Sequence, residues 1–244
     1  MATAIESAVS LPKLSYFKSR GRAELIRLTF AAGGVAFEDE RVSRQEQRRR
    51  KEAGELPFGQ FPTLTLDGKV YAQTYSIAKY AAKLAGLSAS DPLDALAVES
   101  VVDAIEDVRS KFAPIRYMQI TAEMKLEKYT ELFDTTLPPL LSNFERILSK
   151  NTAGDGYMVG NTFTLADVAV FYMCDLLTFP SCEVQLQSVE HTRKGATCLD
   201  AFPQLQKHRE KIATLPQIAD WLSKRPQTPH DNILSLTDAD FSML

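Results

Sequence analysis

The chain has 244 residues, 45% of them hydrophobic and 24% charged, and its formal net charge is -3. This length predicts two packed domains, and the balanced charge gives no general attraction to nucleic acid or to an anionic membrane. The three cysteines, Cys174, Cys182 and Cys198, lack CxxC spacing, which argues against a disulfide framework, a zinc site or a dithiol redox centre.

Residues 11–86 alternate short strand patterns with helical ones. Strands are predicted at 11–17, 37–42, 63–66 and 69–72, with Asp67-Gly68 as the hairpin turn between the last two. Helices are predicted at 19–32 and 74–85. The densely charged stretch 43–51 is expected to be irregular and to hold no core position. This order predicts a small mixed sheet flanked by helices.

Beyond a linker at 87–91 the pattern is helical. Asp91, Pro92 and Asp94 are typical of a helix start, with an N-cap, a proline at the first helical position and an acid in the first turn. Further helices are predicted at 123–150 (interrupted by Pro138-Pro139), from Thr164 onward, at 203–214 and at 216–223. Thr164 and Asp167 resemble a capping box. We expect irregular structure at 178–200 and in a tail at 230–244.

The chain shows no feature of a membrane or secreted protein. No apolar run reaches the roughly 18 to 20 residues that cross a bilayer, and residues 1–10 lack the basic start of a signal peptide. Together with the cysteine pattern, this favours the cytoplasm. No metal-binding or nucleotide-binding motif is found, so we expect no metal and no nucleic-acid or membrane partner.

Several segments, taken in this order, resemble the sigma class of glutathione transferases. They lie at 16–25, 57–62, 67–69, 72–74, 102–107, 163–167 and 221–226. Each is moderately specific alone, and together they are strongly specific and span most of residues 11–229. The resemblance implies a thioredoxin-like α/β domain at 11–86, an all-α domain at 91–229, glutathione as co-substrate and a homodimer.

Tyr16 lies at the end of the first predicted strand. An aromatic residue there is most often a core residue whose hydroxyl finds a partner. The alternative is that the phenol donates a hydrogen bond to a substrate thiolate and lowers the thiol pKa, which is ordinarily about 8.5. The resemblance assigns this role to Tyr16, and it gives Arg22, near the helix start, an electrostatic role.

The resemblance implies that two further positions contact the tripeptide glutathione. Phe61-Pro62 would ordinarily be a trans bond, but the similarity to thioredoxin-like domains implies a cis-proline that turns the Phe61 backbone towards glutathione. Gln73-Thr74 is either a surface amide and an N-cap or a helix start that holds the γ-glutamyl carboxylate. The resemblance also places Phe17 and Gln60 beside glutathione.

Glu99, Asp103 and Asp107 recur at i, i+4 and i+8, which usually indicates a solvated helix face. The resemblance instead implies that Asp103 reaches across the dimer interface to the ammonium group of the glutathione bound by the other subunit. A dimer would then be part of the active site.

The stretch 43–51 departs from the family pattern. Sigma-class members often have a tryptophan here, followed four residues later by a lysine, to hold the glycine carboxylate of glutathione. Counting from Val42, Gln47 stands at the tryptophan position and Lys51 at the lysine position. The neighbouring residues Arg48, Arg49 and Arg50 either supply cations in place of the tryptophan contact or form a solvated basic helix.

The resemblance also bears on the second substrate. The residues expected to border its pocket are Lys18, Ser19, Arg20, Asp107 and Phe112. An apparent insertion at 181–198 could change access to this pocket.

The implied reaction is attack of the glutathione thiolate on an electrophilic carbon of a mostly apolar molecule. Two alternatives stay open: glutathione-dependent isomerisation of a prostaglandin-like endoperoxide, and a non-catalytic binding or structural role like that of S-crystallins. Relatives with thioltransferase activity keep a nucleophilic cysteine at the end of the first strand. No cysteine of this chain stands there, so we do not expect thioltransferase chemistry.

Overall fold

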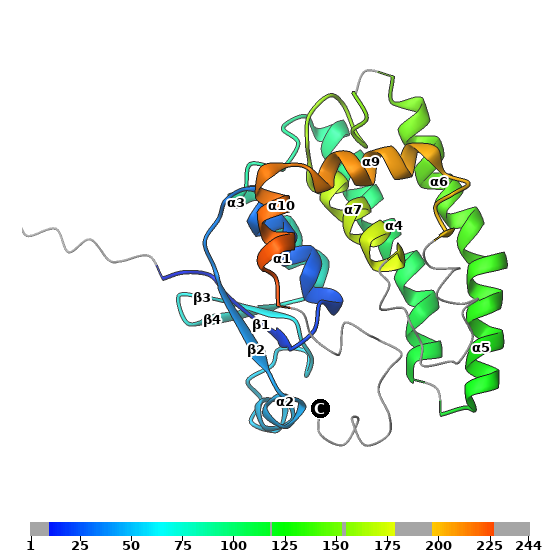
Figure 1. Ribbon diagram of the computed structural model, residues 1–244. Coiled ribbons are helices and arrows are strands. Elements are labelled where there is room, and N and C mark those ends of the chain that lie inside the picture. The colour runs from blue at the N-terminus through cyan, green and yellow to red at the C-terminus, as the bar shows by residue number, and fades with distance from the viewer. Residues whose placement is uncertain (1–9, 118, 153–154, 179–196, 227–244) are drawn as a thin grey trace, which may run out of the picture.

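The computed structural model describes residues 10–117, 119–152, 155–178 and 197–226 (Figure 1). The predicted tail at 230–244, and all but the last two residues of the apparent insertion at 181–198, lie outside these ranges. Within the described ranges, no helix is both long enough and apolar enough to cross a membrane.

The N-terminal part is built on a mixed sheet of four strands. These are β1 (Lys13–Phe17), β2 (Glu38–Val42), β3 (Thr63–Leu66) and β4 (Lys69–Ala72), in the order β2-β1-β3-β4. Strand β1 pairs parallel with β2 and antiparallel with β3. Asp67 and Gly68, with φ of 47° and 78°, join β3 to β4 in the positive-φ geometry that a two-residue hairpin requires. All four predicted strands are therefore confirmed.

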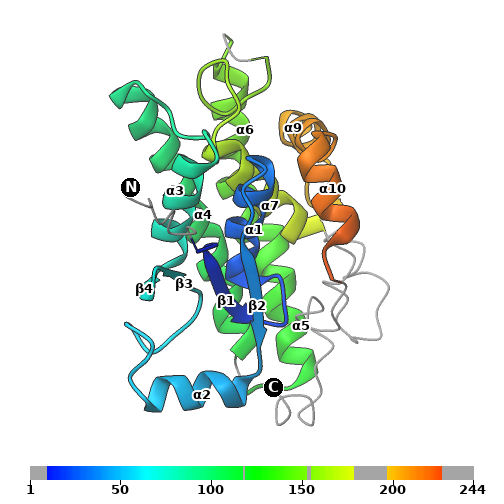
Figure 2. The same cartoon turned by 90° about the vertical axis from the view of Figure 1, so that its left-hand side faces the viewer.

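Helices α1 (Glu24–Ala32) and α3 (Thr74–Leu84) lie behind the strands, on one face of the sheet (Figure 2). The 3-10 turn η1 (Gly21–Ala23) leads into α1, which packs beside α3. The charged stretch predicted to be irregular is instead the helix α2 (Arg44–Glu52). Its N-cap is Ser43, whose hydroxyl accepts the Glu46 N–H at 3.1 Å. None of its residues is buried, as expected, because arginines and glutamates occupy every side of it.

The C-terminal part is helical. Its elements are α4 (Pro92–Tyr117), α5 (Ala122–Glu131), the π-helical segment η2 (Leu132–Thr136), α6 (Leu137–Lys150), α7 (Leu165–Thr178), α9 (Pro203–Ala213) and α10 (Pro216–Lys224). The expected interruption at Pro138-Pro139 takes the form of η2, and the two prolines occupy the first turn of α6. A proline lacks only an N–H that is unpaired there in any case.

Helix α7 is the central element of the fold. Nearly all of its side chains are buried, and it packs against α1 of the N-terminal part as well as against α4 and α9. The predicted capping box is present at its start. The Asp167 carboxylate accepts the Thr164 N–H at 2.8 Å and the Met158 N–H at 2.7 Å. Because α7 contacts helices of both parts, the two parts of the chain share one continuous core.

Candidate active site

Tyr16 lies at the end of β1, and its side chain is 8% exposed. Its hydroxyl oxygen accepts the backbone N–H of Arg22 at 3.1 Å. This leaves the phenolic proton free to be donated to another group. Gly21, with φ of +41°, passes close to the ring, and a Cβ atom added there would lie 2.5 Å from the Tyr16 oxygen. Only glycine therefore fits at this first position of η1.

The side chain of Arg22 is held by an acid from the helical part of the chain. Its guanidinium donates two hydrogen bonds, of 2.7 and 2.8 Å, to the Glu106 carboxylate on α4, and the Tyr75 hydroxyl donates a third at 2.9 Å. Burial opposes ionisation of Glu106, but the hydrogen bonds from Arg22 and Tyr75 outweigh it, so the pKa of Glu106 lies below its ordinary value. The hydrogen bonds with Glu106 also raise the pKa of Arg22. Burial, followed by the charge of Glu106, raises the pKa of Tyr75.

The start of α3 lies next to this cluster. Gln73 adopts a φ of 79°, which side-chain-bearing residues rarely do, and no side chain caps the helix that begins at Thr74. Thr74 is 6% exposed. Uncapped N–H groups at a helix N-terminus attract an anion. The unusual backbone at Gln73 is of a kind found at functional sites.

The loop before β3 forms another side of the site. The Phe61-Pro62 peptide bond is cis, as expected from the resemblance. The Phe61 ring lies edge-on to Phe17, with the ring centroids 5.7 Å apart, and Phe17 in turn lies 5.3 Å from the Tyr16 ring. Tyr16, Phe17 and Phe61 therefore form one aromatic wall that continues from β1 to the start of β3.

One face of α2 is directed towards this loop. Gln47 donates a long hydrogen bond of 3.4 Å to the Gly59 carbonyl, and a Cβ added at Gly59 would lie 3.3 Å from Cε of Lys51. The next residue, Gln60, is exposed. Gln47 and Lys51 therefore lie together, as the spacing of four residues predicts.

The arginines of α2 differ in their surroundings. Arg49 pairs with Glu46 and Glu55, and Arg50 pairs with Glu40 and Glu46. For these two, an ion-paired basic helix, rather than a set of free cations, describes the structure. Arg48 is exposed, and no ion pair is found for it within the described residues.

Comparison with known protein families decides the identity of the chain. The model of the glutathione S-transferase N-terminal domain matches residues 12–83, and that of the glutathione S-transferase C-terminal domain matches residues 106–225. The chain belongs to the glutathione transferase family. Glutathione is the co-substrate of this transferase.

Relatives of the transferase support the assignment. Probable glutathione S-transferase 8 of Caenorhabditis elegans is 33% identical, over 88% of this chain and 97% of the relative. Hematopoietic prostaglandin D synthase of Homo sapiens is 31% identical, again over 88% and 97%. The solved structure of a glutathione S-transferase from the hookworm Necator americanus, described as monomeric, superposes with a TM-score of 0.69 at 30% identity, over 90% of this chain and 99% of that one.

The acidic face of α4 in this transferase is exposed. Asp103 lies 3.6 Å and Glu99 lies 3.1 Å from Nζ of Lys79 on α3, so both carboxylates have a cation within their own chain. Asp107, one turn beyond Asp103, is exposed too, and no ion pair is found for it within the described residues.

The residues expected to border the second-substrate pocket have different environments. Lys18 is exposed, whereas Ser19 is buried. Phe112 is half-buried and packs edge-on against Phe133, with centroids 6.1 Å apart. Arg20 is 5% exposed, and its guanidinium pairs with Asp175 on α7 at 3.0 Å. The structure therefore directs Arg20 into the core between the two parts of the transferase, which leaves little of it for a ligand.

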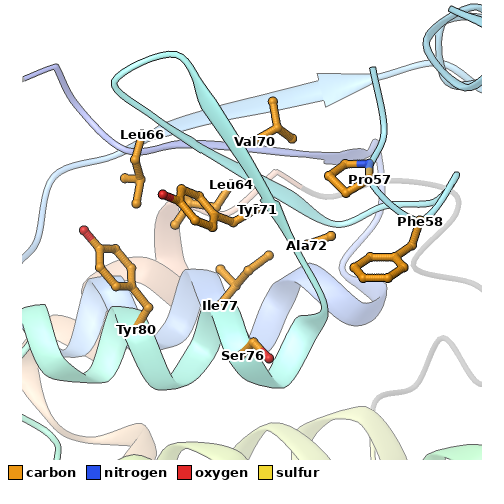
Figure 3. A pocket seen from close by; sticks show the side chains of 10 residues that line it. All are labelled: Pro57, Phe58, Leu64, Leu66, Val70, Tyr71, Ala72, Ser76, Ile77 and Tyr80. Carbon is orange, nitrogen blue, oxygen red and sulfur yellow. The ribbon is translucent and has the colours of Figure 1, made fainter. Parts of the chain in front are cut away.

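A cavity of about 460 Å³ lies between the β3–β4 hairpin, α3 and the loop at 57–58 (Figure 3). Its lining is mainly apolar and includes Phe58, Val70, Tyr71 and Tyr80. None of the residues expected to bind glutathione or to perform chemistry lines it. This cavity is therefore distinct from the site around Tyr16.

Four residues that support the site were missed by sequence reasoning. Glu106, Tyr75 and Tyr172 come from three different helices, and Arg27 is fully buried with Cζ 5.9 Å from the centroid of the Tyr16 ring. Arg27 donates to the Ser19 carbonyl at 2.8 Å and so supports the turn before Gly21. A buried arginine inside an apolar helix pattern is the signal that could have drawn attention to it.

Proposed function

We propose that Tyr16 activates glutathione by donating a hydrogen bond to its sulfur and so stabilising the thiolate. The observation that carries this proposal is the geometry of the phenol. Its oxygen accepts the Arg22 N–H at 3.1 Å, and its proton remains free for a ligand. A donor directed at a thiol favours the charged form and lowers the thiol pKa. Arg22 adds positive charge beside it, although Glu106 offsets part of that charge.

The rest of the tripeptide is proposed to extend along residues that the fold brings together. The Phe61 backbone, beside Pro62, pairs with the cysteinyl unit. The start of α3 at Gln73-Thr74 holds the γ-glutamyl carboxylate. Lys51 and Gln47, on one face of α2, bind the glycine carboxylate, with Phe17 and Gln60 alongside. The proposed limits of the domains that carry these residues are 11–86 and 91–229.

The proposed reaction is attack of this thiolate on an electrophilic carbon of a mostly apolar second substrate. Isomerisation of a prostaglandin-like endoperoxide stays as the second candidate, because a relative is a prostaglandin D synthase. Both reactions need the same ionised sulfur. Assays with an aryl halide and with an endoperoxide, run on the same preparation, distinguish them. Binding of glutathione without turnover of either would favour the non-catalytic alternative.

The experiment that tests the role of Tyr16 is Tyr16→Phe. This change removes the donor and keeps the ring that packs against Phe17. We expect glutathione to bind with nearly unchanged affinity, whereas kcat with an aryl halide falls by about 10²-fold, in the range for loss of a charge-stabilising donor. Tyr157→Phe is the matched control, because Tyr157 packs against Phe163 and Lys211, away from the proposed site. Equal turnover in both variants would remove Tyr16 from the mechanism.

We also propose a homodimer, in which the apolar surface around Phe58, Val70, Tyr71 and Tyr80 contacts the second copy. Phe58 is 65% exposed and Tyr71 is 49% exposed, and both line the cavity of Figure 3. An exposed apolar patch with a hollow is typical of a protein interface. Because one relative is described as monomeric, the oligomeric state needs a direct measurement. Sedimentation equilibrium should give twice the chain mass, and Phe58→Ser should shift it towards the monomer.

In this dimer, Asp103 of the partner subunit is proposed to bind the ammonium group of glutathione. Asp103→Ala should weaken glutathione binding about five- to tenfold, as for a charge-assisted hydrogen bond. Asp107→Ala, one turn away on the same exposed face, is the comparison. If only Asp107→Ala weakens glutathione binding, the interaction belongs to Asp107. If neither variant weakens it, binding of glutathione by an acid of the partner subunit is excluded. A cytoplasmic location is proposed from the sequence features and from the family.

A further inference from the structure

The peptide group between Gly21 and Arg22 lies between two phenols. Its N–H donates to the Tyr16 hydroxyl at 3.1 Å, and its C=O accepts a hydrogen bond from the Tyr172 hydroxyl at 2.9 Å. Tyr172 belongs to α7 and lies 151 residues from Gly21 in the sequence. A single amide therefore connects the proposed thiolate donor to the helical part of the chain.

Arg109, on α4, determines the direction of these hydrogen bonds. Its guanidinium donates to the Tyr172 oxygen, and its Cζ lies 5.7 Å from the centroid of the Tyr172 ring. Because arginine has no acceptor, the single proton of Tyr172 is left for the Gly21 carbonyl. Burial raises the pKa of Tyr172, so this phenol stays protonated and keeps donating at neutral pH.

The chain of hydrogen bonds therefore runs in one direction, from the Arg109 cation through Tyr172 and the amide to Tyr16. A hydrogen bond to an amide oxygen polarises the amide and strengthens its N–H as a donor. Bonds linked in this way strengthen one another by about 10–30% each. A stronger bond to the Tyr16 oxygen makes the O–H of Tyr16 a stronger donor in turn.

We propose that Tyr172 is a positioning residue of this transferase, which, held by Arg109, fixes and polarises the Gly21–Arg22 peptide and so strengthens the hydrogen bond from Tyr16 to the glutathione thiolate. This inference rests on the proposed role of Tyr16. Other charges lie close: the Arg22 guanidinium, which is paired with Glu106, and Glu106 itself, 3.9 Å from Nε of Arg109. None of them bonds to the Gly21 carbonyl.

The Gly21 carbonyl also accepts the backbone N–H of Glu24. The turn therefore keeps one of its two hydrogen bonds when Tyr172 loses its hydroxyl. Tyr172→Phe is consequently a mild change to the fold, and it removes one polarising contact from the amide. Tyr157→Phe is the matched control, because Tyr157 belongs to the same helical part of the chain but packs against Phe163 and Lys211, away from Gly21.

The test measures ionisation as well as turnover. The thiolate absorbance of bound glutathione is followed against pH, and kcat and KM are measured with an aryl halide over the same range. For Tyr172→Phe we expect the pKa of the bound thiol to rise by about 0.3 to 0.6 unit and kcat at neutral pH to fall about two- to fourfold, because the change weakens the hydrogen bond from Tyr16 to the thiolate and does not remove it. KM for glutathione should stay within about twofold, and Tyr157→Phe should match the wild type.

A double variant tests whether Tyr172 acts through Tyr16, as the direction of the chain of hydrogen bonds requires. In a Tyr16→Phe background, Tyr172→Phe should shift the thiol pKa by less than about 0.1 unit, because the receiving hydroxyl is gone. If Tyr172→Phe shifts the thiol pKa equally in the wild-type and Tyr16→Phe backgrounds, Tyr172 does not act through Tyr16 and the proposal is overturned. If Tyr172→Phe does not fold, Arg109→Gln, which leaves both phenols in place, should shift the thiol pKa in the same direction.

The outcomes separate this inference from the proposed function. In one outcome, the wild type ionises and conjugates glutathione, and the thiol pKa of bound glutathione is the same in Tyr172→Phe and Arg109→Gln as in the wild type. The proposed role of Tyr172 is then wrong and the proposed function stands. If the wild type fails to bind glutathione, or binds it without ionising the thiol, both are overturned.

Discussion

The guanidinium of Arg22 and the carboxylate of Glu106 meet through two hydrogen bonds of 2.7 and 2.8 Å, although 84 residues separate them in the sequence. Arg22 follows the turn that contacts Tyr16, and Glu106 belongs to α4 of the helical part. Because Tyr75 at the start of α3 joins the same carboxylate, one acid connects the proposed thiolate site with the proposed γ-glutamyl site. We therefore expect the helical part to contribute to the proposed activation of glutathione through Glu106.

Glu106→Gln should weaken this connection. An amide can accept only part of the bidentate contact and carries no charge to hold the Arg22 guanidinium. We expect kcat/KM for glutathione conjugation to fall by about ten- to a hundredfold, the range for a hydrogen bond to a charged group. Glu99→Gln removes an acid from the exposed face of α4 and serves as control. Steady-state kinetics showing the same kcat/KM in both variants would contradict a role for Glu106.

Gly21→Ala should displace the Tyr16 phenol, because the new Cβ would lie 2.5 Å from its oxygen. The change also introduces a side chain at positive φ, which costs about 1–2 kcal/mol. Gly34→Ala isolates that second effect, since Gly34 has φ of +64° and nothing within 4 Å of its added Cβ. We expect Gly21→Ala to lose more stability in urea unfolding than Gly34→Ala, because it adds the contact with Tyr16 to the cost of positive φ, and only Gly21→Ala to lose about 10²-fold in turnover. Full activity of folded Gly21→Ala would show that the phenol tolerates displacement.

Lys51→Ala should raise KM for glutathione about five- to tenfold and leave kcat nearly unchanged, because the lysine is proposed to bind a carboxylate far from the sulfur. Arg49→Ala removes a cation from the same helix that is already paired with Glu46 and Glu55. It should alter KM by less than about twofold. Kinetics at constant ionic strength distinguish the two, and an equal rise in KM would mean that α2 acts only through its overall charge.

Glu40 should make stability sensitive to acid. Its hydrogen bonds with Arg50, opposed by burial and assisted by Ser15, lower the pKa of Glu40 to about 2. The unfolded carboxyl has a pKa of about 4.3, so between these values the unfolded state binds more protons and stability falls as the pH drops. This contribution is fully present above about pH 4.5 and is lost on approaching pH 2.

The measurement is urea unfolding of wild type and Glu40→Gln at several pH values. The wild type should be more stable by about 1–2 kcal/mol at pH 7, after allowance for partial solvent exposure, and this difference should shrink towards pH 3. A difference that stays constant with pH would mean that the carboxylate charge is not its source.

The strands and most helices could be predicted from local patterns. The Asp67-Gly68 turn determines the register of the β3–β4 hairpin, and the spacing of apolar residues identified the long helices. Helix α2 was missed because its hydrophobic pattern is absent. The helix is stabilised instead by its Ser43 cap and by ion pairs such as that of Arg50 with Glu40. The spacing of apolar residues does not indicate either of these interactions.

The site shows the same division. The cis bond before Pro62 was predicted through the resemblance and is confirmed by the structure, and Gln47 and Lys51, which the resemblance places together, both lie beside Gly59. Glu106, Tyr75 and Tyr172 could not be predicted, because each acts across contacts between elements that are distant in the sequence. The partner of Arg20 was missed for the same reason, since Asp175 lies 155 residues away.

The enclosure of α7 limits how such a protein can change. Nearly every side chain of this helix is buried, and the helix packs against α1, α4 and α9. Few of its positions therefore tolerate a side chain of different shape or volume. Variation that adapts the enzyme to another electrophile should therefore accumulate elsewhere, on the solvent-facing side of α4 and in the chain that follows α7. Laboratory evolution that leaves α7 untouched should yield more folded variants than libraries that randomise it.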